Sequence, residues 1–394
     1  MKKCHLLIIT ASIYMTSISF LIIFNKNMLD YNVVYRTYIA PNVRHRNNMR
    51  VGPINSILES PSHPGRERAP QKTEPWETSA GQHTWIPHLC PRYDEEAFPG
   101  YQRLTWAPPT EDSIYFLQVT CRSWLVGREA CAVESAARHH PHRPLFILMA
   151  LPTLNHTHPL IQVVSSLRNV KMAWLDLDQI FSEEPMGAWH RDRLWMLSRH
   201  MAVMVSDGAR AELLRRYGGT YIDLDAITLR PLPSSTNWMA RLAEDVITTG
   251  ILSFEARHSL WQAFVNDIPE VFEPSGYLSI GAMLLTHHVQ RLCPAALSTS
   301  VSHDQQESCG NITIWPRRLF YPTPNQAPWE VIFKDGEGLG PDFFKSTDAY
   351  SLHLFNHLSG KFHPNLSGDS IVREAARRNC PQVVKVLEEQ RTFL

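Results

Sequence analysis

The pattern of apolar and polar positions changes near residue 110, where scattered polar sequence gives way to regular alternation. Downstream, compact apolar runs predict buried strands, and segments with apolar residues at helical spacing predict helices between them. The expected strands are 114–120, 145–151, 170–175 and 245–254, and the expected helices are 128–138, 160–167 and the segment from residue 370. Alternation of this kind indicates an α/β fold, with a mainly parallel sheet flanked by helices on both faces.

The segment from Met201 to Leu232 combines several of these signals. Apolar residues at helical spacing predict a helix that ends at Gly218-Gly219, where glycine supplies a left-handed residue. The β-branched and aromatic residues of 221–228 then favour a strand. Side chains alternate along a strand, so Asp223 and Asp225 are expected on one face. Ligands of such sheets bind beyond the carboxyl ends of the strands, which is where this pair is expected.

Two neighbouring carboxylates repel each other, and a cation between them relieves that repulsion. Oxygen ligands favour Mg²⁺ or Mn²⁺, which commonly complete their coordination with substrate phosphates. On the preceding helix, Asp207 and Arg210 lie three residues apart and share a face. They would offer a carboxylate to sugar hydroxyls and a guanidinium to phosphate, or they form only a surface ion pair.

The N-terminus predicts a membrane anchor. Residues 6–24 contain no charge and no proline, and as a helix they would span about 28 Å, close to the hydrocarbon thickness of a bilayer. No convincing cleavage site follows, although a cleaved signal peptide stays the alternative. Residues 1–5 are then a cytosolic tail, 25–109 a largely disordered stem, and 110–394 a lumenal catalytic domain.

Two further features favour a lumenal body. Glycosylation sequons begin at Asn155, Asn311 and Asn365. Six of the seven cysteines lie beyond the predicted anchor, where an oxidising compartment permits disulfides. Six cysteines allow fifteen pairings. Our hypothesis joins the pairs that close short loops, which are Cys121–Cys131 and Cys293–Cys309.

Charge and motifs exclude several classes of function. Lysine plus arginine and aspartate plus glutamate both number 38, which gives no reason to expect a nucleic-acid partner. The chain contains no CxxC pair, and the His353–His357 spacing lacks the glutamate of a zinc-protease helix, which argues against zinc. It also contains no P-loop, no GxGxxG and no nucleophile elbow.

The run SDGAR…YGGTYIDLD resembles the core of sugar-nucleotide glycosyltransferases with the GT-A fold and an Asp-x-Asp motif. Within these it is similar to the lactosylceramide 4-alpha-galactosyltransferase and alpha-1,4-N-acetylglucosaminyltransferase family. Further segments resemble landmarks of that family in the expected order, so that the resemblance covers roughly residues 111–394. These segments are CAVESAARHHP (131–141), SCGNIT (308–313), LFYPTP (319–324) and HLFN (353–356).

The resemblance implies a metal-dependent UDP-sugar hexosyltransferase in the Golgi membrane, of single-pass type II topology. Its expected reaction is retaining alpha-1,4 transfer of galactose from UDP-galactose to a glycan acceptor, a glycosphingolipid such as lactosylceramide. The implied metal ligands for Mn²⁺ (or Mg²⁺) are Asp223, Asp225 and His353, with the two aspartates also the catalytic residues. UDP-sugar contacts are expected from Asp207, Arg210, Tyr221, Asp223 and Asn356. A core position for His353 stays equally open.

Two segments depart from the family pattern where the sugars are expected to bind. The chain has Thr249-Gly250-Ile251 where relatives tend to have Asn-Gly-Ala, and Ser279–Met283 differs from the usual Gly-Pro segment. Transfer of N-acetylgalactosamine or N-acetylglucosamine is therefore an alternative. A non-catalytic lumenal partner that binds nucleotide sugar is another. The resemblance also leaves open a homodimer or a heteromer with other Golgi transferases.

Overall fold

The computed structural model describes Cys90 and residues 100–243, 245–277, 279–294, 305–323, 328–336, 338–360, 362–364, 368–392 and 394. The predicted cytosolic tail, anchor and most of the stem lie outside these residues, so their boundaries stay predictions. Within the described part of the chain, no helix is both long enough and apolar enough to cross a membrane.

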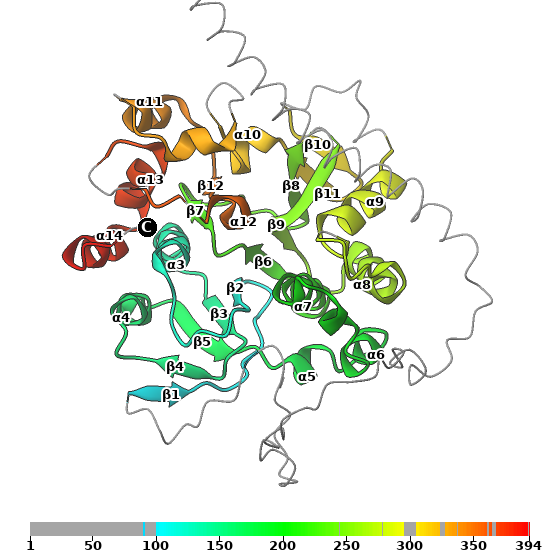
Figure 1. Ribbon diagram of the computed structural model, residues 1–394. Helices are drawn as coiled ribbons and strands as arrows, with labels where there is room; N and C mark the ends of the chain where they lie inside the picture. Colours follow the sequence, from blue (N-terminus) through cyan, green and yellow to red (C-terminus); the bar gives the residue numbers. More distant parts are fainter. Residues whose placement is uncertain are drawn as a thin grey trace, which may run out of the picture. The chain divides into compact units, whose positions relative to one another are not determined.

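One eight-stranded sheet organises the described residues (Figure 1). Its strand order is β10-β11-β8-β9-β6-β2-β3-β5. The strands are β2 (Ile114–Gln118), β3 (Leu145–Met149), β5 (Val170–Trp174), β6 (Gly219–Ile222), β8 (Trp238–Ala243), β9 (Val246–Phe254), β10 (Glu307–Cys309) and β11 (Ile312–Trp315).

The sheet is mixed, which corrects the prediction of a mainly parallel one. Strands β5, β3, β2 and β6 are all parallel, as the strand–helix alternation predicts. Strand β9, however, pairs antiparallel with both β6 and β8. The pair β11–β8 is again parallel, whereas β10–β11 is antiparallel. The β8–β9 hairpin has only a short connection, so no crossover helix enforces parallel pairing there.

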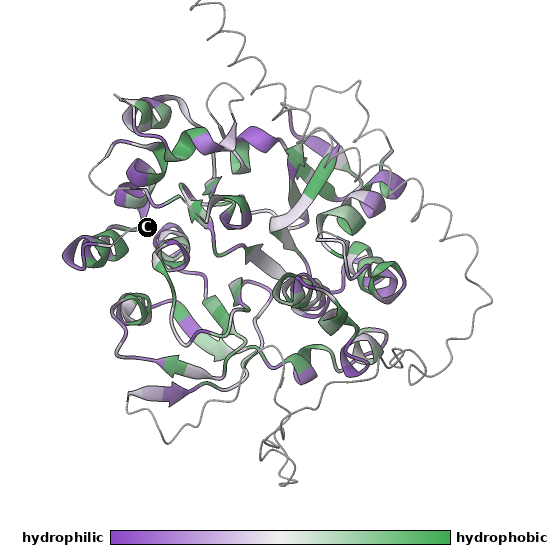
Figure 2. Ribbon diagram, viewed as in Figure 1, coloured by the Kyte–Doolittle hydropathy of each residue, from purple (hydrophilic) through white to green (hydrophobic). Residues whose placement is uncertain are grey.

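Helices cover both faces of the sheet, as predicted. Alternate residues of β2 face opposite cores, with Ile114 and Phe116 in one and Tyr115 and Leu117 in the other. The first core is closed by α3 (Gly127–His139), α4 (Pro159–Ser166), α13 (Ile371–Asn379) and α14 (Pro381–Glu389). The second is closed by α7 (Met201–Tyr217), α8 (Ser259–Val271) and α9 (Ala282–Leu292). In Figure 2, helices such as α8 carry both hydrophobic residues (green) and hydrophilic residues (purple), as expected for amphipathic helices.

Smaller elements complete the fold. Two short antiparallel pairs lie outside the main sheet, β1–β4 and β12–β7. Their strands are β1 (Tyr101–Arg103), β4 (Thr153–Asn155), β7 (Ala226–Thr228) and β12 (Ser351–His353). The remaining helices are α5 (Leu177–Ile180), α6 (Met186–Arg191), η4 (Leu194–Leu197), α10 (Arg317–Phe320), η6 (Trp329–Phe333), α11 (Leu339–Ser346) and α12 (Asn356–Ser359).

Three disulfides join the six cysteines among the described residues. Cys293–Cys309 is confirmed. The predicted Cys121–Cys131 pair is wrong, because Cys121 bonds to Cys90 and Cys131 bonds to Cys380. Cys131 lies within α3 on the side that packs against α14, and its partner is 249 residues away in the chain. A rule based on short loops cannot find a bond that depends on packing between distant helices.

The polar residues of α3 are satisfied by the fold itself. Glu134 is fully buried, and its carboxylate accepts hydrogen bonds from the N–H groups of Gln382 (3.1 Å) and Val383 (2.8 Å), at the start of α14. Ser135 Oγ accepts a hydrogen bond from the N–H of Thr228 (3.0 Å). Two histidines follow the same rule: His139 Nε2 lies 2.8 Å from Asn379 Oδ1, and His140 Nε2 accepts from the N–H of Leu232. The 131–141 landmark therefore holds distant segments against α3.

Candidate active site

The two aspartates lie in a turn. This turn interrupts the strand that was expected over 221–228. Strand β6 ends at Ile222, β7 begins at Ala226, and the N–H of Ala226 donates to the carbonyl of Asp223 (3.1 Å). The prediction that Asp223 and Asp225 alternate along one continuous strand is therefore wrong. Their position at the carboxyl end of β6 is as expected. The turn brings both carboxylates to the same side by a different route.

The helix that precedes this turn is as predicted. Helix α7 runs over Met201–Tyr217, and Gly218 and Gly219 follow with φ of +64° and +91°. At Gly218 a side chain would also meet the backbone of Ala256 and Phe254 at under 3 Å. The glycine pair therefore permits both the reversal and the close approach of β6 to its neighbours.

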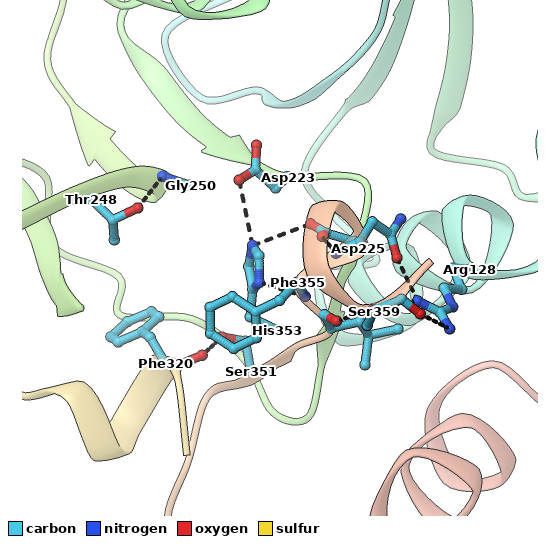
Figure 3. Close-up of polar contacts among 12 residues, drawn as sticks. Arg128, Asp223, Asp225, Thr248, Gly250, Phe320, Ser351, His353, Phe355 and Ser359 are labelled. Carbon is cyan, nitrogen blue, oxygen red and sulfur yellow. Dashed lines mark hydrogen bonds and ion pairs between the residues drawn. The ribbon is translucent and has the colours of Figure 1, made fainter. Parts of the chain in front are cut away.

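Asp223, Asp225 and His353 converge on one point (Figure 3). One ligand atom from each residue lies within 4.8 Å of the others. His353 Nε2 is 3.1 Å from Asp225 Oδ1 and 3.5 Å from Asp223 Oδ2. The side chains are 25%, 14% and 10% exposed for Asp223, Asp225 and His353, so all three are partly buried yet reachable. His353 therefore lies among polar partners, and its role as a metal ligand stays a prediction.

Backbone pairing brings His353 to the aspartates across 130 residues of sequence. In the β12–β7 pair, His353 lies opposite Ala226, directly after the turn. The N–H of Leu354 then donates to the carbonyl of Asp225 (2.7 Å), and the N–H of Asn356 donates to Asp225 Oδ2 (2.7 Å). The N–H of Phe355 donates to His353 Nδ1 (3.1 Å), which turns Nε2 toward the carboxylates. The HLFN motif thus fixes both its own histidine and Asp225.

Arg210 is buried, and its guanidinium is directed at internal groups. Nη1 donates to the carbonyl and to the hydroxyl of Thr249, both at 2.9 Å. Nη2 donates to Ser206 Oγ (3.1 Å) and lies 3.2 Å from Asp223 Oδ1. The guanidinium carbon also stacks over the ring of Tyr221, 4.2 Å from its centroid. These contacts hold Asp223 in place, and contact with a phosphate stays a prediction.

Asp207 is enclosed more tightly than the metal-ligand candidates. It is 4% exposed, and its Oδ1 lies 3.4 Å from Arg210 Nη1. Burial raises the pKa of its carboxyl group to about 6, although Arg210 acts in the opposite direction. A side chain at Gly281, the residue before α9, would meet Asp207 Oδ2 at 2.4 Å. The divergent Ser279–Met283 segment therefore packs directly on Asp207.

Charge is distributed unevenly among the three converging groups. The pKa of Asp223 lies below its usual value because Arg210 and His353 outweigh the effect of burial. Burial raises the pKa of Asp225, although His353 opposes this, and the charge of Asp223 adds to the increase. The pKa of His353 is raised, since Asp225 and Asp223 outweigh burial. Two acids that perturb each other in this way favour a bound cation.

The other two predicted donor contacts also lie at this site, and both contact an aspartate. The hydroxyl of Tyr221 donates to Asp223 Oδ1 (2.6 Å), so its polar end orients the carboxylate. Asn356 reaches Asp225 through its backbone N–H, while its side-chain Oδ1 accepts from Arg128 Nη1 (2.8 Å). The structure therefore brings together all seven predicted site residues, three at the convergence point and four around it.

The sequence reasoning missed residues that shape the site without carrying charge. Gly250 in β9 lies against Asp223: its carbonyl accepts from the N–H of Asp223, and a side chain there would meet Oδ2 at 2.6 Å. The same side chain would meet the hydroxyl of the buried Tyr321 at 3.0 Å. A glycine inside an apolar strand is a recognised signal of close approach and could have identified Gly250. No local signal identifies Tyr321.

The site fits a divalent cation of the Mg²⁺ or Mn²⁺ type. Two carboxylates and an imidazole supply hard oxygen ligands and a nitrogen ligand that Mn²⁺ also accepts. Arg210 supplies one positive charge, and the carboxylates of Asp207 and Asp223 lie beside it. The remaining exposure of Asp223 leaves room for further ligands from a substrate.

Comparison with known proteins agrees with this geometry. A glycosyltransferase sugar-binding region containing a DXD motif matches residues 127–244, which include Asp223 and Asp225. An alpha 1,4-glycosyltransferase conserved region matches residues 253–387, which include His353. The fold and the site therefore define a DXD-containing glycosyltransferase. Within that class, the chain is similar to the alpha-1,4-galactosyl and N-acetylglucosaminyl transferases.

Characterised relatives cover most of the described chain. Lactosylceramide 4-alpha-galactosyltransferase of Homo sapiens is 29% identical over 279 residues, which is 69% of this chain and 76% of the relative. Alpha-1,4-N-acetylglucosaminyltransferase of Homo sapiens is 27% identical over 302 residues, 74% of this chain and 85% of the relative. Among solved structures, PaToxG glycosyltransferase is 14% identical with a TM-score of 0.34, covering 48% of this chain and 71% of that one. A structural likeness at that level carries no argument about the site.

Proposed function

We propose that this protein transfers a hexose, galactose in alpha-1,4 linkage, from a UDP-sugar to a glycan with retention of configuration. The observation that carries the proposal is the convergence of Asp223, Asp225 and His353 within 4.8 Å in a chain of this family. The names of the relatives support galactose as the sugar and a glycosphingolipid such as lactosylceramide as the acceptor. N-acetylglucosamine is the second candidate sugar because the other named relative transfers it.

In this proposal, Asp223, Asp225 and His353 hold Mn²⁺ or Mg²⁺. A bound ion supplies positive charge opposite the diphosphate as the sugar–phosphate bond breaks. Arg210 keeps the carboxylate of Asp223 ionised and oriented, since it lies 3.2 Å from Oδ1. The N–H of Asn356 does the same for Asp225.

The sugar itself is proposed to lie beside Asp207. That carboxylate lies between Arg210 and Gly281, and Gly281 belongs to the 279–283 segment in which this chain departs from its family. The pair of aspartates at 223 and 225 is assigned to the metal, so the carboxylate-pair geometry of glycoside hydrolases does not apply here. Donor selection is therefore expected to depend on Asp207 and the 279–283 segment.

A donor and acceptor array tests the proposal. Full-length protein in detergent is incubated with UDP-galactose, UDP-N-acetylgalactosamine or UDP-N-acetylglucosamine, with lactosylceramide or soluble glycans, in Mn²⁺ or in chelator. We expect Mn²⁺-dependent galactose transfer to lactosylceramide. UDP binding without hydrolysis or transfer to any acceptor would instead favour a non-catalytic partner. Transfer that is unchanged by chelator would contradict the metal assignment.

We also propose that the protein is a Golgi type II membrane protein anchored by residues 6–24, with residues 25–109 as its stem. The sequon at Asn155 lies in a turn in which the Asn155 side chain accepts from the N–H and hydroxyl of Thr157. Asn311 is exposed. Digestion with an N-glycosidase should lower the apparent mass, and Asn155→Gln with Asn311→Gln should remove part of that shift. A protein without glycans in secretory cells would contradict the lumenal assignment.

A further inference from the structure

Arg128 is a buried cation in the first turn of α3 that takes no part in the assignments above. It is 6% exposed. Nη1 donates to Asn356 Oδ1 (2.8 Å) and Ser359 Oγ (2.7 Å), and Nη2 donates to the carbonyls of Ser359 (3.3 Å) and Phe362. The guanidinium carbon also lies 5.1 Å from the centroid of the Phe333 ring. These acceptors are all 228 to 234 residues away in the sequence.

Most of these acceptors belong to the short helix α12 and the residues after it, and α12 also contacts the metal-ligand candidates. The first residue of α12, Asn356, gives its side chain to Arg128 and its backbone N–H to Asp225 Oδ2. At the other end, Ser359 Oγ accepts from Arg128 and donates to the carbonyl of Leu354. The N–H of Leu354 in turn donates to the carbonyl of Asp225 (2.7 Å). Figure 3 shows Arg128, Ser359, Asp225 and His353 in this sequence of contacts.

A four-residue helix of this kind has little stability of its own, because helix nucleation is costly and short helices depend on tertiary contacts. Arg128 provides these contacts through several N–H groups in one rigid plane, which lysine does not reproduce. It therefore fixes both ends of α12 at once. Two hydrogen-bonded routes, through Asn356 and through Ser359 with Leu354, lead from the guanidinium to Asp225.

We infer that Arg128 is a positioning residue for the divalent-cation site. Acting through α12, it holds Asp225 in the geometry that binds the ion and donor diphosphate. The inference rests on the proposed function, since it concerns the affinity of the same site for its ion. It assigns to this buried arginine a role in binding, beyond its contribution to folding. Outer-shell partners of metal ligands typically change metal affinity by about 10- to 100-fold.

Direct Mn²⁺ titration of the full-length protein in detergent, followed by electron paramagnetic resonance of free Mn²⁺, tests this role without requiring turnover. We expect Arg128→Met to weaken Mn²⁺ binding about tenfold or more, and Arg128→Lys to recover only part of the loss. The matched control is Arg241→Met, which removes another buried arginine, one that pairs with Glu307 at 2.8 Å in the β8–β10 region. Arg241→Met should lower stability and leave Mn²⁺ affinity unchanged.

A second variant keeps the inference testable if Arg128→Met fails to fold. Asn356→Ala removes the side-chain acceptor of Arg128 but keeps the backbone N–H that donates to Asp225. As a single substitution it should weaken Mn²⁺ binding a few-fold. In the Arg128→Lys background the same substitution should cause a smaller further loss of Mn²⁺ affinity, since the effects of coupled residues are non-additive. Full additivity, or an Mn²⁺ affinity in folded Arg128 variants equal to that of the unaltered protein, would overturn the inference alone. Absence of Mn²⁺ binding by the unaltered protein would overturn the metal assignment and this role together.

Discussion

Two polar regions of this protein look alike in sequence and behave oppositely in the fold. The α3 region, with Glu134 and His140, and the turn with Asp223 and Asp225 both place titratable groups among apolar residues. In α3, backbone N–H groups of distant segments satisfy Glu134 and His140. At the turn, two carboxylates stay close together and partly exposed. A buried polar group that the fold satisfies contributes stability, whereas a cluster that repels itself is available for a ligand.

The largest expected effect is the loss of sugar transfer when a carboxylate is removed from the turn. Asp225→Ala, or Asp223→Ala, should lower sugar transfer at least about a thousandfold, because about 4 kcal/mol of transition-state stabilisation is lost with the ion. Both variants should still fold. Asp225→Ala should change the free energy of unfolding little, since it relieves repulsion, whereas Asp223→Ala should also lose some stability because the buried Arg210 then lacks its partner at 3.2 Å. Initial rates at saturating Mn²⁺ and thermal unfolding measure the two effects. Transfer at the unaltered rate in either variant would contradict the site.

Glu134→Gln should show the opposite pattern. The substitution keeps the shape of the side chain but turns an N–H group toward one of two backbone donors at the start of α14. The free energy of unfolding should fall by about 3 kcal/mol, as expected for a buried charged hydrogen bond. Chemical denaturation gives that value, and the transfer rate per folded molecule should stay unchanged. A selective loss of rate in a fully folded variant would remove the distinction between the two regions.

The histidine of the α3 region should produce a pH dependence of stability. Burial lowers the pKa of His140 from 6.5 to about 4, with Arg143 adding to the effect. The folded protein therefore binds fewer protons than the unfolded chain between these values. The contribution of neutral His140 to stability should be fully present above pH 6.5, and about 3 kcal/mol should be lost toward pH 4.

Denaturation of the unaltered protein and His140→Gln across this pH range isolates that contribution. In the variant, the free energy of unfolding should depend less on pH over this range, because the glutamine amide does not titrate. Parallel pH profiles for the two proteins would show that His140 is not responsible.

The smallest expected effect tests how closely β9 must approach the turn. Gly250→Ala places a methyl group 2.6 Å from Asp223 Oδ2, so the carboxylate must shift. We expect transfer to fall about tenfold, equivalent to about 1.4 kcal/mol, with little change in thermal stability. Gly336→Ala is the matched control, since the nearest neighbour of its added methyl group would be Leu339 Cβ at an ordinary 3.7 Å. Equal rates for both variants would indicate that Asp223 tolerates displacement.

The strand–helix part of the fold could be predicted because its signals are local. Strands β2, β3 and β5 are compact apolar runs, and α3, α4 and α7 follow helical spacing. The region that contains β8, β10 and β11 gave no such pattern. The β11–β8 pair joins residues more than 70 positions apart in the chain, because Trp238 pairs with Thr313. The prediction of a mainly parallel sheet therefore missed the antiparallel pairs β6–β9, β8–β9 and β10–β11.

The charged ligands of the site could also be predicted, but their surroundings could not. Asp223 and Asp225 are separated by a single residue in the sequence, and the family resemblance pointed to His353. Arg128 and Tyr321 lack a local signature that links them to the turn, since each meets it only through tertiary contacts, whereas Gly250 carries only the weak signal of a glycine within an apolar strand. The Cys131–Cys380 bond was missed for the same physical reason.

The Cys131–Cys380 bond also limits the order in which this protein matures. Its two sulfur atoms come from residues 249 positions apart, so the second cysteine leaves the ribosome long after α3 has been made. Until then, Cys131 cannot form its native bond. Oxidation at this site therefore reports that nearly all of the catalytic body has been synthesised and docked, and a prematurely terminated chain would carry a reactive thiol that quality control could recognise.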